Sequence, residues 1–166
     1  MKGLYQISLF VFIVSFIFLS NSITVFSKEN IGETHLSEEI QEYCSEIGNI
    51  YGISEELLLS IIEHESGGNQ YAENGSCKGL MQVSVRWHSG RMEKLGVTDI
   101  YDEYGNILVA TDYIAEMRDD YEDVALVLMI YNGSSDAKER ANSGNLTNYA
   151  ESVLERSAEL ERLRNK

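Results

Sequence analysis

The sequence IIEHESGG at residues 61–68, followed by GLMQ at residues 79–82, says more about this chain than any other stretch. An ideal helix through residues 57–66 turns by about 100° per residue, which gathers its apolar side chains on one face. Glu65 falls within roughly 20° of the middle of that face, whereas Glu63 points to roughly the opposite side. Acids are rarely buried without a partner or a task. We therefore interpret Glu65 as a candidate proton donor.

Two physical effects act on a carboxyl group in the position of Glu65. Burial disfavours the charged form, and the negative end of the helix dipole acts in the same direction. Both raise the pKa of Glu65 toward the working pH, as a general acid requires. The alternative is a structural carboxyl group bonded to the adjoining loop, where Gly67 and Gly68 permit close backbone approach. Helix geometry by itself does not decide between the two.

Capping residues on both sides of this stretch predict further helices. Ser37 is the expected N-cap of a helix that ends at Gly52, and Ser54 caps the helix that carries Glu65. A short helix is expected over residues 90–95, and Asn106 is the expected cap of a longer one.

The second half of the chain follows the same pattern. Residues 124–130 are apolar all round and by periodicity alone could form a buried strand, but their helical surroundings favour a central helix. Thr147 is the expected start of the last helix. The sequence therefore predicts a mainly α, single compact helical domain, α+β at most, with a very small strand element.

Composition limits the partners of the chain. It has 166 residues, of which 43% are hydrophobic, and a formal net charge of −14. This charge argues against nucleic acid as a partner, and no Lys/Arg cluster offsets it, so anionic membrane surfaces are disfavoured too. An anionic polymer would be held by shape and hydrogen bonds.

The N-terminus is typical of an export sequence. Lys2 precedes an apolar run at residues 7–19 and small polar residues. We interpret residues 1–27 as a signal peptide or, alternatively, as an uncleaved signal anchor, because the segment carries too little charge to exclude a membrane span. Residues 28–35 are the expected linker and residues 36–166 the domain. Both interpretations place the domain outside the cytoplasm.

Export gives the two cysteines a candidate role. Cys44 and Cys77 are a candidate disulfide that would tie the first helix to the loop after Glu65. The alternative is two free thiols that behave as small hydrophobes. A zinc site is not expected, because a metalloprotease helix needs a second histidine where this chain has Gly68. No cofactor is expected.

Four short motifs in order resemble those of soluble-type lytic transglycosylases, which belong to the lysozyme-like superfamily. They are Glu65-Ser66, Gly79-Leu80-Met81-Gln82, the run from Ala125 to Tyr131-Asn132-Gly133, and Tyr149. Each is weak alone, and their common order makes the resemblance specific over about residues 50–153. The chain departs from the family pattern by a slightly short loop after Glu65 and by Cys77, Ala110 and Ser134.

The resemblance implies a bacterial, extracytoplasmic enzyme whose sugar-binding cleft takes peptidoglycan glycan strands. It implies that Glu65 is the single catalytic acid and base, which forms 1,6-anhydro-muramic ends without a cofactor. It also implies substrate-side roles for a further set of residues: Ser66, Met81, Gln82, Tyr131, Asn132 and Tyr149. A methionine at such spacing is otherwise plain core.

Alternatives stay open at this point. A hydrolytic muramidase of the same fold would deliver water to the anomeric carbon and leave a reducing end. Ordinary glycosidases pair two carboxylates, and the chain offers Glu73, Asp99 and Asp102 as possible second ones, none of them fixed by spacing. A non-catalytic peptidoglycan-binding or envelope-assembly module is a further alternative. The resemblance also admits an envelope-spanning secretion or conjugation machine as a partner.

Overall fold

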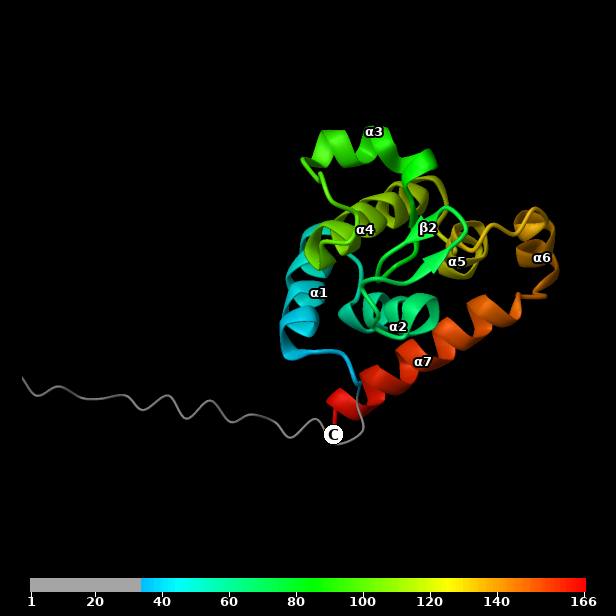
Figure 1. The fold of residues 1–166 in the computed structure, drawn as a ribbon. Helices are drawn as coiled ribbons and strands as arrows, with labels where there is room; N and C mark the ends of the chain where they lie inside the picture. Colours follow the sequence, from blue (N-terminus) through cyan, green and yellow to red (C-terminus); the bar gives the residue numbers. More distant parts are fainter. Residues whose placement is uncertain (1–33) are drawn as a thin grey trace, which may run out of the picture.

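Helix α2 (Glu55–Ser66), which carries Glu65, lies in the middle of the fold and packs against α1 and α7 (Figure 1). The computed structural model describes residues 34–166, so the predicted signal segment and most of the predicted linker lie outside the described residues. Within that range the other elements are α1 (Glu38–Tyr51), β1 (Glu73–Asn74), β2 (Cys77–Lys78), β3 (Val83–Ser84), α3 (Val85–Leu95), α4 (Glu103–Asp120), α5 (Val124–Tyr131), α6 (Ala137–Ser143) and α7 (Asn148–Arg164). None of the helices described is long and apolar enough to cross a membrane.

The small sheet lies beside the C-terminal end of α2. Its three short antiparallel strands have the order β1-β2-β3, with Cys77 opposite Ser84 and Asn74 opposite Cys77. The turn at residues 79–82 joins β2 to β3. The prediction of a mainly helical domain with a very small strand element is confirmed.

Local signals fixed the ends of the first two helices as predicted. The Ser37 hydroxyl accepts from the Ile40 amide and begins α1, and Gly52 ends it in the left-handed conformation. Ser54 accepts from the Leu57 amide and begins α2, and Gly67 ends it with a φ of 61°. Both helices therefore start and stop where their caps require.

The core is built mainly from helix faces around α2. Leu58, Leu59, Ile61 and Ile62 of α2 are fully buried, and residues 127–129 of α5 pack into the same core. The apolar run at 124–130 is thus a helix, as predicted, because burial on nearly all sides suits a central helix as well as a strand.

Three helices differ from the prediction. Helix α4 begins at Glu103, because the Asp102 carboxylate accepts from the Gly105 amide at 2.7 Å. Asn106 therefore lies inside the helix and is fully buried, rather than capping it. Helix α3 starts five residues earlier than expected, at Val85, and α6 was not predicted.

The predicted disulfide is not formed. Cys44 and Cys77 are both free thiols, and they lie in different surroundings. Cys44 is fully buried on α1, near Glu55 and Arg164, and burial raises the pKa of its thiol to about 12. Cys77 lies half-buried on β2 and lines a surface cavity. The second of the two interpretations, two unbridged thiols, is the one that the structure bears out.

Candidate active site

Glu65 lies near the C-terminal end of α2, half-buried, and a hydroxyl group from another helix is hydrogen-bonded to its carboxylate. The Tyr149 hydroxyl donates to Glu65 Oε1 at 2.7 Å, although the two residues are 84 positions apart. Helix α7 supplies Tyr149 from its first turn, where the Thr147 cap sets the start of the helix. Because Oε1 accepts this bond, the proton of a neutral Glu65 belongs on Oε2.

Electrostatics favour the neutral form of Glu65. Burial raises the pKa of its carboxyl above the ordinary 4.5, although the bond from Tyr149 and the charge of His64 act against the rise. The pKa of Tyr149 is itself raised well above 10, by burial first and then by the negative charge of Glu65. The phenol therefore keeps its proton and remains a hydrogen-bond donor at working pH.

A cavity of about 750 Å³ opens beside Glu65. It is lined by residues of α2, the small sheet, α3, α4 and α5. Three other residues from the predicted set line it together with the acid: Gln82, Tyr131 and Asn132. The fold thus collects four predicted residues from distant parts of the chain on one cavity.

The turn at residues 79–82 has an unusual backbone. Gly79 has a φ of 80°, and a Cβ there would lie 2.2 Å from Asn106 Nδ2, so only glycine fits. Gln82 is the one non-glycine residue with positive φ in the described range, at 50°. Its Nε2 donates to the carbonyls of Ala72 and Gly79 at 3.1 and 3.0 Å. Backbone strain of this kind is typical of functional sites.

Two side chains from other helices hold the turn in place. Asn106 Oδ1 accepts from the Met81 amide at 2.8 Å, and its Nδ2 donates to the Lys78 and Ile100 carbonyls. The Tyr131 hydroxyl donates to the Met81 carbonyl at 2.6 Å. Both main-chain polar groups of Met81 are therefore satisfied, so the turn is fixed without bound substrate.

Three of the predicted substrate-side residues are not among those that line the cavity: Tyr149, which is bonded to Glu65, and Ser66 and Met81. Met81 is fully buried, as expected for a methionine that belongs to the hydrophobic core. The Ser66 hydroxyl donates to the Ile62 carbonyl at 3.3 Å and accepts from the Gly68 amide at 3.1 Å. Neither side chain is among those that line the cavity, so both can affect the site only through the loop and the turn that they hold.

The proposed second carboxylates are engaged elsewhere. Glu73 pairs with Lys78 at 2.6 Å, Asp99 accepts from the Tyr101 amide, and Asp102 caps α4. Of the carboxylates described in residues 34–166, Glu65 and Glu116 line the cavity, and Glu116 is bonded to Arg91 at 2.6 Å. The same residues contain no group of three or more side chains suited to hold a metal ion.

Sequence reasoning missed the wall of the cavity that α3 and α4 form. This wall includes Trp87, His88 and Arg91 of α3, with Tyr113 of α4. It also missed Asn106, whose signal was present in the sequence. Asn106 occupies the same helical face as Ile107, Ala110 and Ile114, and a polar residue on an apolar face needs buried partners.

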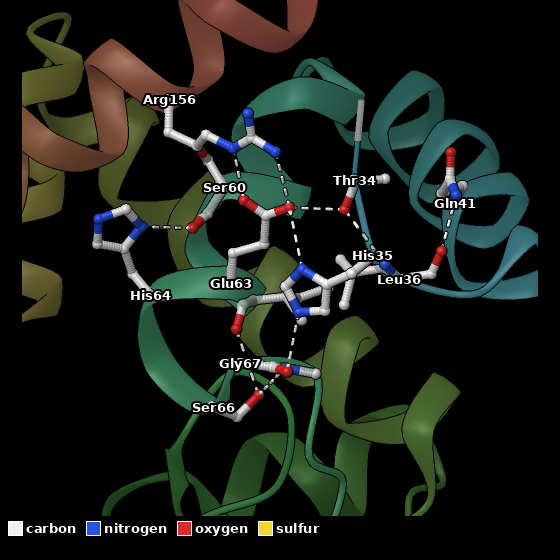
Figure 2. Close-up of polar contacts among 12 residues, drawn as sticks. Thr34, His35, Leu36, Gln41, Ser60, Glu63, His64, Ser66, Gly67 and Arg156 are labelled. Atoms are coloured by element: carbon white, nitrogen blue, oxygen red, sulfur yellow. Dashed lines mark hydrogen bonds and ion pairs between the residues drawn. The ribbon is translucent and has the colours of Figure 1, made fainter. Parts of the chain in front are cut away.

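The other acid of this stretch, Glu63, has a different environment (Figure 2). Arg156 of α7 donates to both of its oxygens, at 2.6 and 3.2 Å, and Thr34 donates to Oε1 at 2.6 Å. His35 lies 3.8 Å from the same oxygen. Burial alone would raise the pKa of Glu63, but the bonds from Arg156 and Thr34 outweigh it and bring the pKa below 4.5. Thr34 and His35, assigned to the linker, are thus attached to the domain.

Comparison with known proteins identifies the family to which the chain is similar. Residues 42–152 match the model of the family described as the transglycosylase SLT domain. The membrane-bound lytic murein transglycosylase C of Serratia proteamaculans (strain 568) is 32% identical over 98 residues, which cover 52% of this chain and 27% of that protein. The membrane-bound lytic murein transglycosylase E of Buchnera aphidicola subsp. Acyrthosiphon pisum is 31% identical over 103 residues, covering 52% of this chain and 47% of that one.

A viral relative extends the comparison. The transglycosylase of Enterobacteria phage PRD1 is 32% identical over 86 residues, which cover 51% of this chain and 31% of the phage protein. The chain thus matches less than half of the length of each of these relatives. The family match spans most of residues 34–166 and includes both Glu65 and Tyr149. From the match and the site together, the chain belongs to the transglycosylase SLT domain family of the lysozyme-like superfamily.

Proposed function

We propose that this chain is a peptidoglycan lytic transglycosylase that acts outside the cytoplasm. It cleaves the β-1,4 bond between N-acetylmuramic acid and N-acetylglucosamine and leaves 1,6-anhydro-muramic ends. One observation carries the proposal: in a member of this family, a half-buried carboxyl group with a raised pKa lines a cavity and accepts a hydrogen bond from the neutral Tyr149 hydroxyl. The murein transglycosylases among its relatives support the same substrate.

In the first step Glu65 acts as the acid. Its Oε2 proton passes to the glycosidic oxygen as the bond to the muramic anomeric carbon breaks. The acetamido oxygen of the same sugar attacks that carbon, so the substrate supplies the nucleophile. The Glu65 carboxylate that results still accepts the Tyr149 hydrogen bond, which strengthens as charge develops on the oxygen.

In the second step the same residue acts as the base. The Glu65 carboxylate takes the proton of the C6 hydroxyl, and the C6 oxygen attacks the anomeric carbon as the acetamido oxygen departs. The 1,6-anhydro ring closes, and Glu65 is again neutral. A pKa raised toward the working pH suits a group that must both give and take a proton.

Substrate contacts are assigned to Gln82, Tyr131 and Asn132, which line the cavity with the acid. Ser66 and Met81 act indirectly, through the shape of the loop and the turn. Tyr149 acts through Glu65: its hydroxyl group orients the carboxylate and lowers the pKa that burial raises.

The hydrolytic muramidase is the second candidate, and one observation bears on it. Glycosidases that use two carboxylates place them across the scissile bond. In the described part of the chain, the other acid on the cavity is Glu116, and it is ion-paired with Arg91. This supports the substrate-assisted route over the two-carboxylate route.

Product analysis tests the proposal. Purified sacculi are digested with the wild type and with Glu65→Gln, and the released fragments are analysed by mass spectrometry. We expect anhydro-muramic ends from the wild type and no release by the variant, which keeps the shape of Glu65 without its proton. Reducing ends would indicate a muramidase instead. Binding to sacculi without release of fragments would indicate a non-catalytic module.

A further inference from the structure

Helix α3 presents an exposed indole to the cavity that Glu65 lines. Trp87, the one tryptophan of the chain, is 75% exposed. Large aromatic side chains in folded domains are usually covered, so an open indole at a cavity needs an explanation. Trp87 and Glu65 line the same cavity, so the indole lies within reach of any long ligand bound at the acid.

A row of ring contacts leads from Tyr131, at the acid, to His88 on α3, the chain neighbour of Trp87. The ring centroids of Tyr131 and Tyr113 are 6.1 Å apart, and those of Tyr113 and His88 are 4.6 Å apart. Trp87 directly precedes His88 in the chain, and all four side chains line the cavity. At the inner end of the row, the charge of Glu65 helps raise the pKa of Tyr131. The cavity is thus aromatic along its length as well as at the acid.

Polar contacts attach α3 to the domain and fix this row. Arg91 forms ion pairs with Asp112 and with Glu116, and its guanidinium lies 5.3 Å from the centre of the Tyr113 ring. Met92 is the buried residue of α3. Because the helix is attached through its second half, its first turn is left to carry Trp87 at the cavity.

The charge of the aromatic row suits an uncharged ligand. Burial and the charge of Arg91 lower the pKa of His88 below 6.5, and they outweigh Glu116, so the imidazole is neutral at neutral pH. Arg86 lies over one face of the indole at 5.3 Å, and the side chain is still three-quarters exposed. Aromatic faces flanked by polar groups bind the C–H faces of sugar rings and leave the sugar hydroxyls in water.

We propose that Trp87, with His88 beside it, stacks on a sugar ring of the glycan strand beyond the two sugars that flank the scissile bond. The assignment rests on the proposed function, since it places the same strand along the cavity from Glu65 to α3. Trp87 then sets a preference for longer strands, and it takes no part in the proton transfers.

Binding to the inactive Glu65→Gln variant tests this assignment apart from cleavage. The disaccharide, tetrasaccharide and hexasaccharide of the peptidoglycan repeat, free of peptide, are titrated by calorimetry and by tryptophan emission. Emission reports on Trp87 alone, because the chain has no other tryptophan. We expect the longer sugars to shift the emission and to bind more tightly than the disaccharide.

A second substitution in the same background gives the decisive comparison. Trp87→Ala should weaken binding of the hexasaccharide by about fivefold to tenfold and leave that of the disaccharide unchanged. Trp87→Phe should restore most of the loss. Tyr71→Ala is the matched control, because Tyr71 is 68% exposed but does not line the cavity, and it should change neither affinity.

The outcomes separate this assignment from the proposed function. Equal hexasaccharide affinity with and without Trp87 would overturn the subsite, even if the wild type cleaves sacculi. An emission shift that only peptide-bearing fragments produce would overturn it too, since the indole would then bind the peptide. A length-dependent shift supports the subsite even if the wild type proves to be a muramidase or a binding module.

Discussion

Glu63 and Glu65 are two carboxyl groups on the same helix, two residues apart, with opposite environments. Glu63 is bonded to Arg156 and Thr34, and its pKa falls below 4.5. Glu65 is bonded to a neutral phenol, and its pKa rises above the same value. Burial raises the pKa of both. They differ in their donors: hydrogen bonds from Arg156 and Thr34, together with the charge of Arg156, outweigh burial at Glu63, whereas the bond from Tyr149 does not outweigh it at Glu65.

On this fold, a carboxylate held in an ion pair differs from a carboxyl group that can donate a proton. A carboxylate paired with a guanidinium is stable as an anion and has little tendency to donate a proton. The pairing of Glu63 holds α7 and the chain at residue 34 against α2 (Figure 2). Helix α7 in turn carries Tyr149, so the structural acid supports the position of the chemical one.

The largest expected effect is that of Glu65→Gln on cleavage. Loss of a general acid and base should lower the rate of sacculus digestion by about 10²- to 10⁴-fold. Thermal stability should stay the same or rise, because an amide removes the cost of a half-buried ionisable group. Turbidity clearance and a thermal melt measure the two quantities. A variant that is unstable as well as inactive would contradict the contrast between the two acids.

Glu63→Gln should have the reverse pattern. It leaves Arg156 with a weaker partner at a largely buried site, so the free energy of unfolding should fall by about 2–4 kcal/mol. Urea denaturation measures this loss. Cleavage per folded molecule should be retained well below the melting temperature. If activity disappeared while the fold persisted, Glu63 would take part in the chemistry.

Tyr149→Phe sharpens the comparison, because it removes the hydroxyl group that donates to the Glu65 carboxylate. That bond lowers the pKa of Glu65, so its loss should raise the pKa further and extend the acid form to higher pH. The carboxylate formed during the reaction loses a donor, and kcat should fall about tenfold.

A pH–rate profile measures both effects of Tyr149→Phe. The wild-type rate should fall as pH rises through the elevated pKa of Glu65. In the variant this fall should occur at higher pH. Tyr131→Phe is the matched control, since its hydroxyl donates to the Met81 carbonyl and not to Glu65. Tyr131→Phe should lower stability without changing the pH at which the rate falls. If the rate of Tyr149→Phe fell at lower pH than that of the wild type, Tyr149 would not be the donor that lowers the pKa of Glu65.

The smallest expected effect is the pH dependence of stability, and its sign differs between the two acids. The lowered pKa of Glu63 contributes stability above 4.5 that is lost as pH falls through the folded-state value. The raised pKa of Glu65 contributes stability below 4.5 that is lost as pH rises through its folded-state value. Urea titrations of the wild type and the two glutamine variants across acid pH measure both. If both acids changed the free energy of unfolding in the same direction as pH rises, the contrast between Glu63 and Glu65 would be wrong.

Local sequence signals were sufficient for the starts of α1, α2 and α7 and for the partly buried position of Glu65, whereas α5 was predicted from its helical surroundings. A serine or threonine cap and a left-handed glycine act within a few residues, so the sequence alone locates them. The resemblance to the family added Gln82, Tyr131 and Asn132, which line the cavity.

Contacts between distant residues could not be predicted in the same way. The partner of Glu63 is 93 positions away, and its role depends on how α7 crosses α2. Asn106 holds a turn 25 positions earlier in the chain. Trp87 became a site residue only through the position of α3 beside α4. Each depends on packing between helices, which periodicity does not specify.

The two unbridged thiols give the molecule a selective chemical label. Thiolates rather than thiols react with maleimides, and a pKa of about 12 together with full burial makes Cys44 inert. Cys77 lines the cavity from β2, next to the turn and within the electrostatic reach of Tyr131. A single equivalent of reagent should therefore modify the cavity wall of the unaltered protein. Occupancy of the cavity by a ligand can then be followed as protection of one sulfur atom.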